Sequence, residues 1–502
     1  MHPSPAPPSP ADLFIALLKR LEADPDATRR AAERHEADPP AVRRPARHLD
    51  LLLREAGTAG LLAWIRQEQD GLPEVERVLL AAQAIDRWYA PFAAVHDPAG
   101  PPAPDHLLVR RRFNRHGRLN GDPADGQLIV RHGYLGRRMA VGEAAEPGEF
   151  DAADLFRTLF LVPPRVPAGT AHDDSCRRMI DVRFTRRREP ADRNPFDPDW
   201  APAVAVVPLA QAEEDIAIRQ FRRDGTDWYD PVPRDLGARA AGAIRALAGD
   251  GATFVIFPEV ALHPDALGAV KQALRAQAVD GPIRYVLAGT RQPAPDGGKP
   301  FNRAVLLDRT GAEVVVQTKL HCWDLDSDQC RSYDLRSPDG RVLGGVNEFI
   351  APGGRLELVE LPNLGRLAVM ICEDLDRSQP GDWLRRSMLL DWVVTPVLDS
   401  GLTTGRWQAR EGAATSQSGS CRVVVANSMT FSHRFNRAAR GGGHDRDVIA
   451  DCGVALFFQP RRSQQGRPRV RLLTLPLDAP DGSRVCARWQ PADWDELPEP
   501  KP

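Results

Sequence analysis

Lysine, closely paired cysteines and long apolar segments are scarce in this chain of 502 residues. Only five of its 66 basic residues are lysine, so a lysine inside an apolar segment is expected to have a role that arginine cannot take. No two of the seven cysteines have C-x-x-C spacing, which argues against a zinc knuckle. No apolar run approaches the roughly 18 residues that span a bilayer, and the first ten residues lack the basic and apolar regions of a signal peptide. We therefore expect a cytoplasmic protein with thiol cysteines, no metal site and no membrane partner.

The charge of the chain also limits its partners. The formal net charge is −2, which gives no general attraction for nucleic acid. One stretch is nonetheless dense in arginine. It could bind phosphate or an acidic partner, or it could be the solvated face of an arginine-rich chain; aromatic residues hardly interleave with it, so nucleic acid is not the expected partner. Its arginines are Arg110, Arg111, Arg112, Arg115, Arg118, Arg131, Arg137 and Arg138.

Composition divides the chain into six segments. Proline and aspartate concentrate between residues 189 and 202, where we place the main domain boundary. Residues 105–188 mix short strand patterns at 107–109 and 127–130 with a helix pattern at 152–161. The predicted segments are a disordered tail at 1–10, a bundle of four or five helices at 11–98, the mixed Arg-rich region at 105–188, the linker at 189–202, a larger domain at 203–480 and a C-terminal tail at 481–502.

The larger domain alternates apolar strand patterns with amphipathic helix patterns, broken by a hairpin at Arg309-Thr310-Gly311. Such a pattern favours an α/β fold with two stacked sheets and helices outside them. The expected strands cover residues 204–209, 253–257, 284–289, 304–308, 313–318, 356–361, 367–371, 392–396, 422–426, 453–458 and 469–475, and the expected helices 235–247, 264–278, 383–390 and 406–417.

Three reactive side chains each follow an apolar strand pattern. Glu259 ends FVIFPE, Lys319 ends VVVQTK and Cys372 ends LAVMIC. Strand ends on one edge of a sheet meet at a common crevice. There the glutamate could deprotonate the thiol, and the lysine could stabilise the resulting anions. The alternatives are a surface acid at Glu259, a lysine extending from a strand end, and a small buried core cysteine at Cys372.

The spacing of these motifs resembles the nitrilase, or carbon–nitrogen hydrolase, superfamily over residues 201–480. The motifs are FPE at 257–259, TKLH at 318–321 and ICED at 371–374, with their reactive residues 60 and 53 positions apart. The resemblance implies an α-β-β-α sandwich, a homodimer or higher homo-oligomer, and no metal or organic cofactor. It also implies that Glu259 is general base and acid, that Cys372 is the nucleophile, and that Lys319 and the backbone N–H of Glu373 form the oxyanion hole.

Smaller matches surround this set, and two features depart from it. The matches are the segments 301–304, 351–353, 394–396 and 425–427; the last ends in Asn427, a possible auxiliary residue. Many members of the family carry a second glutamate shortly after the lysine, which this chain lacks there. Asp324, Asp326 and Asp328 are the candidates to replace it. The helix at 406–417 also lacks the usual Arg-Ala-x-Glu-Asn ending, so the resemblance does not define the substrate.

Two functions remain open from the sequence. The first is hydrolysis of an amide or nitrile of a small molecule through a cysteine thioester. The second is a catalytically weak or inactive nitrilase-like interaction or effector protein, for instance in bacterial defence or signalling, regulated through its N-terminal domain and a protein partner. The missing second glutamate favours the second function, and the complete Glu-Lys-Cys set favours the first.

Overall fold

The computed structural model forms two compact units, Met1–Pro164 and Arg165–Pro502, here called the first and second unit. Each is described by itself. The described residues are 8–67, 71–94, 126–130, 152–156, 158–169, 178–187, 202–277, 281–337, 340–341, 343–361, 364–387, 390–419, 421–440, 448–460, 467–490 and 494–496. The predicted strand at 107–109, the arginine-dense stretch, and the predicted linker up to residue 201 lie outside them.

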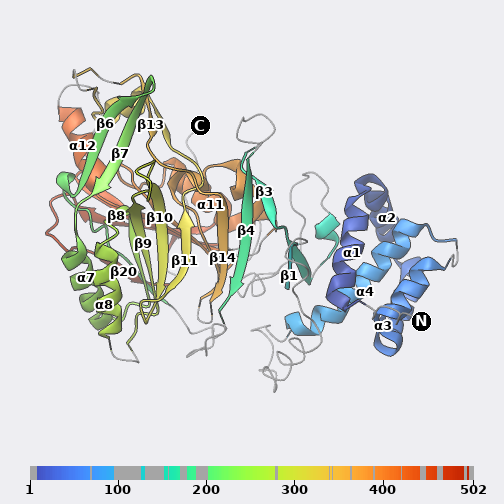
Figure 1. Ribbon diagram of the computed structural model, residues 1–502. Coiled ribbons are helices and arrows are strands. Elements are labelled where there is room, and N and C mark those ends of the chain that lie inside the picture. Colours follow the sequence, from blue (N-terminus) through green and yellow to red (C-terminus); the bar gives the residue numbers. More distant parts are fainter. Residues whose placement is uncertain are drawn as a thin grey trace. The chain divides into compact units, whose positions relative to one another are not determined.

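The first unit contains the expected helical bundle. Ser9 caps its first helix, because the Asp12 N–H donates to the Ser9 hydroxyl at 3.1 Å and Pro10 fits the first helical turn. The apolar stripe of that helix is buried against the other helices. The helices are α1 (Pro10–Glu22), α2 (Pro25–Ala37), α3 (Pro39–Arg66) and α4 (Glu74–Ala94), drawn in blue in Figure 1.

A small two-stranded sheet completes the described part of the first unit. Strand β1 (Gln127–Val130) was predicted, and it pairs antiparallel with β2 (Leu159–Val162). The predicted helix at 152–161 is wrong beyond its first turn, because only η2 (Ala152–Leu155) is helical and β2 follows it. Asp86 of α4 favours this arrangement, since its carboxylate accepts the N–H groups of Thr158 and Leu159 at 2.9 and 2.7 Å.

The second unit is a four-layer α-β-β-α sandwich, which confirms the fold expected for this part of the chain. Its six-stranded sheet has the order β11-β10-β9-β8-β5-β20, and its nine-stranded sheet has the order β21-β19-β18-β17-β16-β15-β14-β4-β3. Helices α7 (Gly237–Gly249) and α8 (Ala266–Arg275) cover the six-stranded sheet (Figure 1). Helices α10 (Ser378–Ser387) and α11 (Trp407–Gly419) contact strands of the nine-stranded sheet. Phe254 of β8 meets Trp392 of β16 between the sheets, with ring centroids 6.4 Å apart.

Burial explains why the central strands are apolar throughout. Strand β8 is buried at every position, because α7 and α8 cover one face of its sheet and the second sheet covers the other. The predicted strands of this region are all present, and all but β11 have shifted ends: β5 (Ala203–Val206), β8 (Phe254–Leu262), β9 (Tyr285–Gln292), β10 (Phe301–Asp308), β11 (Glu313–Thr318), β14 (Arg355–Leu361), β15 (Gly365–Val369), β16 (Trp392–Val397), β17 (Arg422–Asn427), β18 (Asp451–Gln459) and β19 (Arg469–Pro476).

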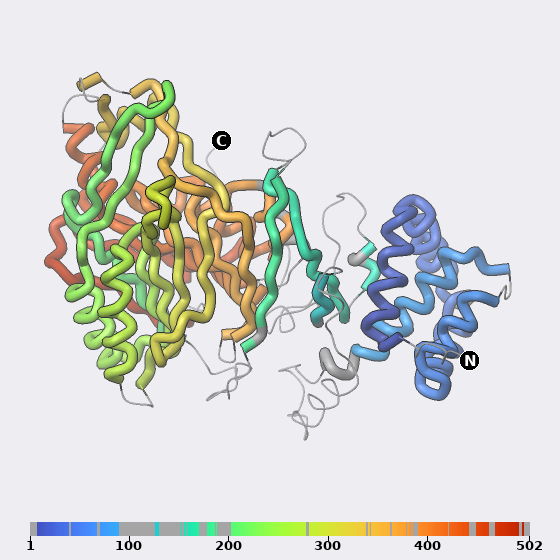
Figure 2. Tube along the Cα trace, viewed as in Figure 1, coloured from blue at the N-terminus to red at the C-terminus, as the bar shows by residue number. Residues whose placement is uncertain are grey.

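The sandwich extends beyond residues 203–480 at both ends. Strands β3 (Arg165–Pro167) and β4 (Met179–Arg186) were not predicted; their residues were assigned to the mixed region, and they join the nine-stranded sheet through β14. Strands β20 (Val485–Arg488) and β21 (Asp495–Glu496) were not predicted either; their residues were assigned to the tail, and they pair with β5 and β19. These strands are short or rich in charge, so they show no apolar run. Figure 2 traces both chain segments into the sandwich.

A third, four-stranded sheet was not predicted. Its order is β12-β13-β7-β6, from β6 (Ile216–Arg223), β7 (Thr226–Pro233), β12 (Asp324–Asp326) and β13 (Gly345–Glu348). Asp224 and Gly225 form the β6–β7 turn with φ of 53° and 79°, as a tight hairpin requires. The Asp-Gly pair could therefore have indicated this hairpin from the sequence. It was overlooked because the arginines and prolines of β6 and β7 are not typical of strands. Two further helices, α9 (Ser327–Ser332) and α12 (Thr430–Arg440), were also missed.

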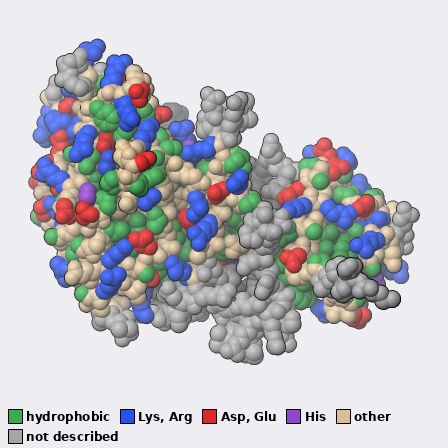
Figure 3. All heavy atoms as spheres, viewed as in Figure 1, with side chains coloured by type: hydrophobic (Ala, Val, Ile, Leu, Met, Phe, Trp, Pro, Cys, Tyr) green, Lys and Arg blue, Asp and Glu red, His purple; other side chains and the backbone are tan. Residues whose placement is uncertain are grey.

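Surface charge agrees with the balanced composition. On the face drawn in Figure 3, basic and acidic side chains are interspersed over the second unit. In the part of the chain that the structure describes, no helix is both long and apolar enough to cross a bilayer.

Candidate active site

A bulge in β8 positions Glu259. The pairing of β8 with β9 shifts register between Phe257 and Leu262, and Val260 adopts a φ of 53°. The bulge requires a glycine on the neighbouring strand, because a Cβ on Gly289 would lie 1.9 Å from the carbonyl oxygen of Pro258. The result is a glutamate inside β8, which continues to Leu262 rather than ending before Glu259 as predicted, with an exposed fraction of only 3%.

Lys319 lies between two carboxylates. It directly follows β11, and its backbone N–H donates to the Asn302 carbonyl at 2.8 Å. Its Nζ lies 2.9 Å from Oε1 of Glu259 and 2.8 Å from Oε2 of Glu348, the last residue of β13. All three side chains are buried, so they form a desolvated cluster of two acids and one ammonium.

Asn302 and Trp323 hold the two carboxylates in place. The Asn302 amide donates to Oε1 of Glu259 at 2.7 Å and to Oε1 of Glu348 at 3.2 Å. The Trp323 N–H donates to Oε2 of Glu348 at 3.0 Å. Among the described residues, no hydrogen bond reaches Oε2 of Glu259. That oxygen is thus available to exchange a proton.

Cys372 begins the turn η5 (Cys372–Leu375) that follows β15 and the two residues after it. Its φ of 49° is unusual for a residue other than glycine, and such strained positions concentrate at functional sites. The carboxylate of Asp374 fixes the turn by accepting the N–H groups of Leu320 and His321 at 3.0 and 2.9 Å. One buried aspartate therefore ties the segment after Lys319 to the turn after Cys372.

The cluster changes the protonation of all three reactive groups. Burial raises the pKa of Glu259, with Glu348 adding to the rise and Lys319 opposing it. Burial alone would lower the pKa of Lys319, but Glu259 and Glu348 raise it well above its usual value, so Lys319 stays an ammonium. Burial and Glu259 raise the pKa of Cys372, with Lys319 opposing them. Cys372 is therefore expected to be a neutral thiol near neutral pH.

Residues before the predicted domain also support the site. The His321 ring lies 3.0 Å from Asp374 through Nδ1 and 2.8 Å from the Ala168 carbonyl through Nε2. The Arg178 guanidinium donates to the Leu320 carbonyl. The segment around β3 and β4 thus contacts the two residues that directly follow Lys319.

The structure brings Glu348 to Lys319, rather than any of the three aspartates considered from the sequence. Asp326 caps α9, accepting the N–H groups of Asp328 and Gln329 at 2.8 Å each. The Asp328 carboxylate is 68% exposed and pairs with Arg331. Asp324 is exposed as a residue, but its carboxyl group is partly shielded from solvent, which raises its pKa although Arg377 opposes the rise. Glu348 was missed because it lies 29 residues past Lys319, beyond the short window in which an acid was sought.

Asn427 contacts the loop after β16 and not the Glu-Lys cluster. Its amide oxygen accepts the Asp399 N–H at 2.9 Å, and its amide nitrogen donates to the Asp399 carbonyl at 3.0 Å. Asp399 in turn accepts the Tyr333 hydroxyl at 2.6 Å and pairs with Arg406 at 2.8 Å. The charge of Asp399 contributes to the raised pKa of Cys372, so this network borders the site.

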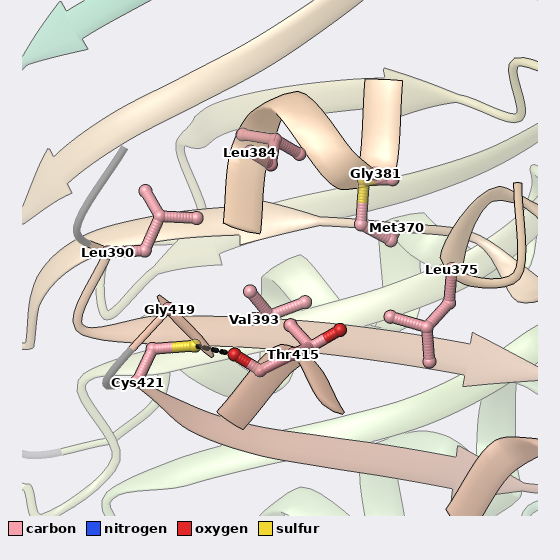
Figure 4. A pocket seen from close by; sticks show the side chains of 9 residues that line it. All are labelled: Met370, Leu375, Gly381, Leu384, Leu390, Val393, Thr415, Gly419 and Cys421. Atoms are coloured by element: carbon pink, nitrogen blue, oxygen red, sulfur yellow. Dashed lines mark hydrogen bonds between the residues drawn. The ribbon is translucent and has the colours of Figure 1, made fainter. Parts of the chain in front are cut away.

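A small cavity lies behind the Cys372 turn and is separate from the reactive groups. Figure 4 shows its mostly apolar lining from β16, α10, α11 and the segment 370–375 that follows β15, including Met370, Leu384 and Val393. Its volume of about 10 Å³ is at the lower limit for one water molecule. It belongs to the hydrophobic layer beneath the helices and is too small for a substrate. Among the described residues, no group of three or more His, Cys, Asp or Glu side chains could hold a metal ion.

Comparisons with known proteins agree with the motifs. No family model matches the chain. Omega-amidase NIT2 from Danio rerio is 27% identical over 155 residues, which are 29% of this chain and 51% of that protein, so the chain spans about half the length of this curated relative. This match confirms the resemblance to the nitrilase superfamily.

Two solved structures match the chain at low sequence identity. The C. elegans NitFhit protein is 17% identical with a TM-score of 0.32, over 45% of this chain and 51% of that one. An amidase from Nesterenkonia sp. is 13% identical with a TM-score of 0.31, over 55% of this chain and 91% of that one.

Proposed function

We propose that the second unit hydrolyses a non-peptide carbon–nitrogen bond, in an amide or a nitrile, through a thioester on Cys372. The observation that carries this proposal is the buried cluster in which Lys319 bridges Glu259 and Glu348 at 2.9 and 2.8 Å. The pKa of Cys372 responds to two of these groups, since Glu259 raises it and Lys319 lowers it. A base, a cation and a thiol in one desolvated site are the groups that acyl transfer requires.

In the first half-reaction, Glu259 takes the thiol proton as Cys372 attacks the amide carbon. Lys319 and the N–H of Glu373 stabilise the oxyanion that forms. Glu259 then gives its proton to the departing nitrogen, ammonia leaves, and the thioester remains. The raised pKa of Glu259 suits its work as base and as acid, because a carboxyl group whose pKa is closer to neutral pH can both accept a proton and return it.

In the second half-reaction, Glu259 deprotonates a water molecule that attacks the thioester carbon. The carbon–sulfur bond breaks, the carboxylic acid leaves, and the proton returns to the thiolate. Amide and water are thereby converted to acid and ammonia. Glu348 takes no proton in this scheme; it keeps Lys319 charged and directed at the site.

Ammonia release from a panel of small amides and nitriles tests the proposal. Amides come first, since the curated relative is an omega-amidase by name. Wild-type protein should release ammonia from at least one compound, and Cys372→Ala should release none. Cys421→Ala, at another buried cysteine, is the matched control and should retain activity. Equal ammonia release by wild type and Cys372→Ala would contradict the proposal.

We prefer hydrolysis to the alternative of an inactive interaction or effector protein. The alternative was favoured by a missing second glutamate, and Glu348 now supplies an acid at Lys319. A cytoplasmic location, homo-oligomerisation and a protein partner for the first unit remain predictions, as do the limits of the domains.

A further inference from the structure

Tyr229 belongs to the unpredicted four-stranded sheet and is directed toward the reactive cluster. It lies on β7, directly opposite Glu348 of β13 in the parallel pairing of these strands. Residues opposite one another in neighbouring strands extend their side chains on the same face of the sheet. The side chain of Tyr229 therefore extends on the face from which Glu348 reaches Lys319. The Phe349 N–H donates to the Tyr229 carbonyl at 2.8 Å, which fixes this register.

The phenol of Tyr229 is buried among the groups assigned to chemistry. The residue has an exposed fraction of 1%. Its pKa is raised well above the usual value by burial and by Glu348, with Lys319 opposing and Glu259 and Cys372 adding further rises. The hydroxyl consequently stays protonated at any physiological pH and can donate a hydrogen bond.

That donor has no partner within the described residues. A buried tyrosine hydroxyl usually has one, as Tyr333 does in Asp399 at 2.6 Å. The Glu348 carboxylate beside Tyr229 already accepts Lys319, Asn302 and the Trp323 N–H. A neutral donor next to the nucleophile, without a protein acceptor, fits an oxygen atom of the substrate.

We propose that the Tyr229 hydroxyl is a third oxyanion donor, which hydrogen-bonds the substrate oxygen together with Lys319 and the Glu373 N–H. This inference rests on the proposed function, because it names a donor for the same intermediate. It also gives the β6–β7 hairpin a catalytic role, because β7 places Tyr229 opposite Glu348.

Tyr229→Phe removes only the hydroxyl and is the variant to test. Tyr285→Phe is the matched control, since Tyr285 is a buried tyrosine of β9 that pairs with Phe254, at the end of β8 away from Glu259. With an amide that the wild type hydrolyses, kcat should fall about 100-fold in Tyr229→Phe, the usual effect of losing one oxyanion donor, with little change in KM. The control should keep its kcat.

Two further readouts separate a donor from a structural residue. Alkylation of Cys372 by iodoacetamide forms no oxyanion, so its rate should be the same in Tyr229→Phe and wild type. Propionaldehyde adds reversibly to a thiol and forms a tetrahedral adduct with one oxygen. Bound aldehyde should protect Cys372 from alkylation by iodoacetamide. The aldehyde concentration needed for half protection should be about tenfold higher in Tyr229→Phe than in wild type, because the adduct oxygen has lost one donor.

Two results with Tyr229→Phe would overturn the inference: an unchanged kcat, or an alkylation rate of Cys372 that falls as much as kcat does. Equal protection by aldehyde in the variant and the wild type, or no protection of the wild type, would also overturn it. The aldehyde measurement needs no turnover. If the wild type hydrolyses no amide or nitrile but aldehyde protection is weaker in Tyr229→Phe, then the proposed hydrolysis fails while the placement of Tyr229 is supported.

Discussion

Glu348 and Lys319 are 2.8 Å apart, although 29 residues separate them in the sequence. The contact joins the four-stranded sheet to the end of β11 in the sandwich. Because both side chains are buried, each charge depends on the other for compensation. The position of the lysine is therefore set by a strand outside the sheet that carries it.

Replacing Glu348 should impair turnover. Glu348→Gln keeps the size of the side chain but removes one of the two charges that hold Lys319, so we expect kcat to fall by about 100-fold, as misplacement of a catalytic group by about 1 Å does. Steady-state kinetics on an amide measure it. Asp328→Asn is the control, since Asp328 is exposed and pairs with Arg331, and its kcat should stay at the wild-type value. An equal fall of kcat in both variants would contradict a specific role for Glu348 in holding Lys319.

The pH dependence of turnover should report the pKa of Glu259. In the proposed mechanism Glu259 acts as a base and must be ionised, so activity should be lost as the pH falls through its pKa, which burial and Glu348 raise above the ordinary value. Removing the Glu348 charge removes one cause of that rise. The acid limb of kcat/KM in Glu348→Gln should therefore shift to lower pH than in wild type, and a shift to higher pH would contradict this assignment.

Alkylation of Cys372 should be slow at neutral pH and should accelerate as the pH rises. Burial and Glu259 raise the pKa of this thiol, so its reactive thiolate is scarce near pH 7. Rates of iodoacetamide labelling at Cys372, followed by peptide mass spectrometry, test this. Cys486 is exposed and serves as the internal reference. Faster labelling of Cys372 than of Cys486 at pH 7 would show that the resting thiol is already ionised.

The sequence predicted the sandwich and the positions of its reactive residues because both depend on local patterns. Apolar runs mark buried strands, and Glu259, Lys319 and Cys372 each follow one. Glu348 and Tyr229 could not be found in this way, since they become neighbours only through the pairing of β13 with β7. β4 was missed because its alternating charged residues resemble a loop, although β14 pairs with it along its length. Long-range pairing is the information that these local patterns lack.

The start of a functional fragment should lie near residue 165 and not near residue 197. A fragment 165–502 keeps β3, β4 and the contact of His321 with Ala168, whereas a fragment 197–502 exposes the edge of β14 and removes that contact. We expect the longer fragment to be soluble and to keep the wild-type kcat per site. The shorter one should aggregate or lose at least most of its activity. Size-exclusion chromatography and ammonia release compare them, and equal behaviour would show that β3 and β4 are dispensable.

Gly289→Ala should destroy the bulge that presents Glu259. The new Cβ would lie 1.9 Å from the Pro258 carbonyl oxygen and 2.9 Å from the Glu259 Cα, and both are backbone atoms that cannot rotate away. We expect a destabilisation of a few kcal/mol, as for other overpacked core positions, and loss of activity in any protein that still folds. Gly242→Ala in α7 is the control, because no atom lies within 4 Å of its added Cβ and alanine favours a helix by about 0.5–1 kcal/mol. Thermal unfolding should thus show a lower Tm for the first variant and an equal or higher Tm for the second. A Gly289→Ala protein with wild-type Tm and kcat would show that Glu259 does not need the bulge.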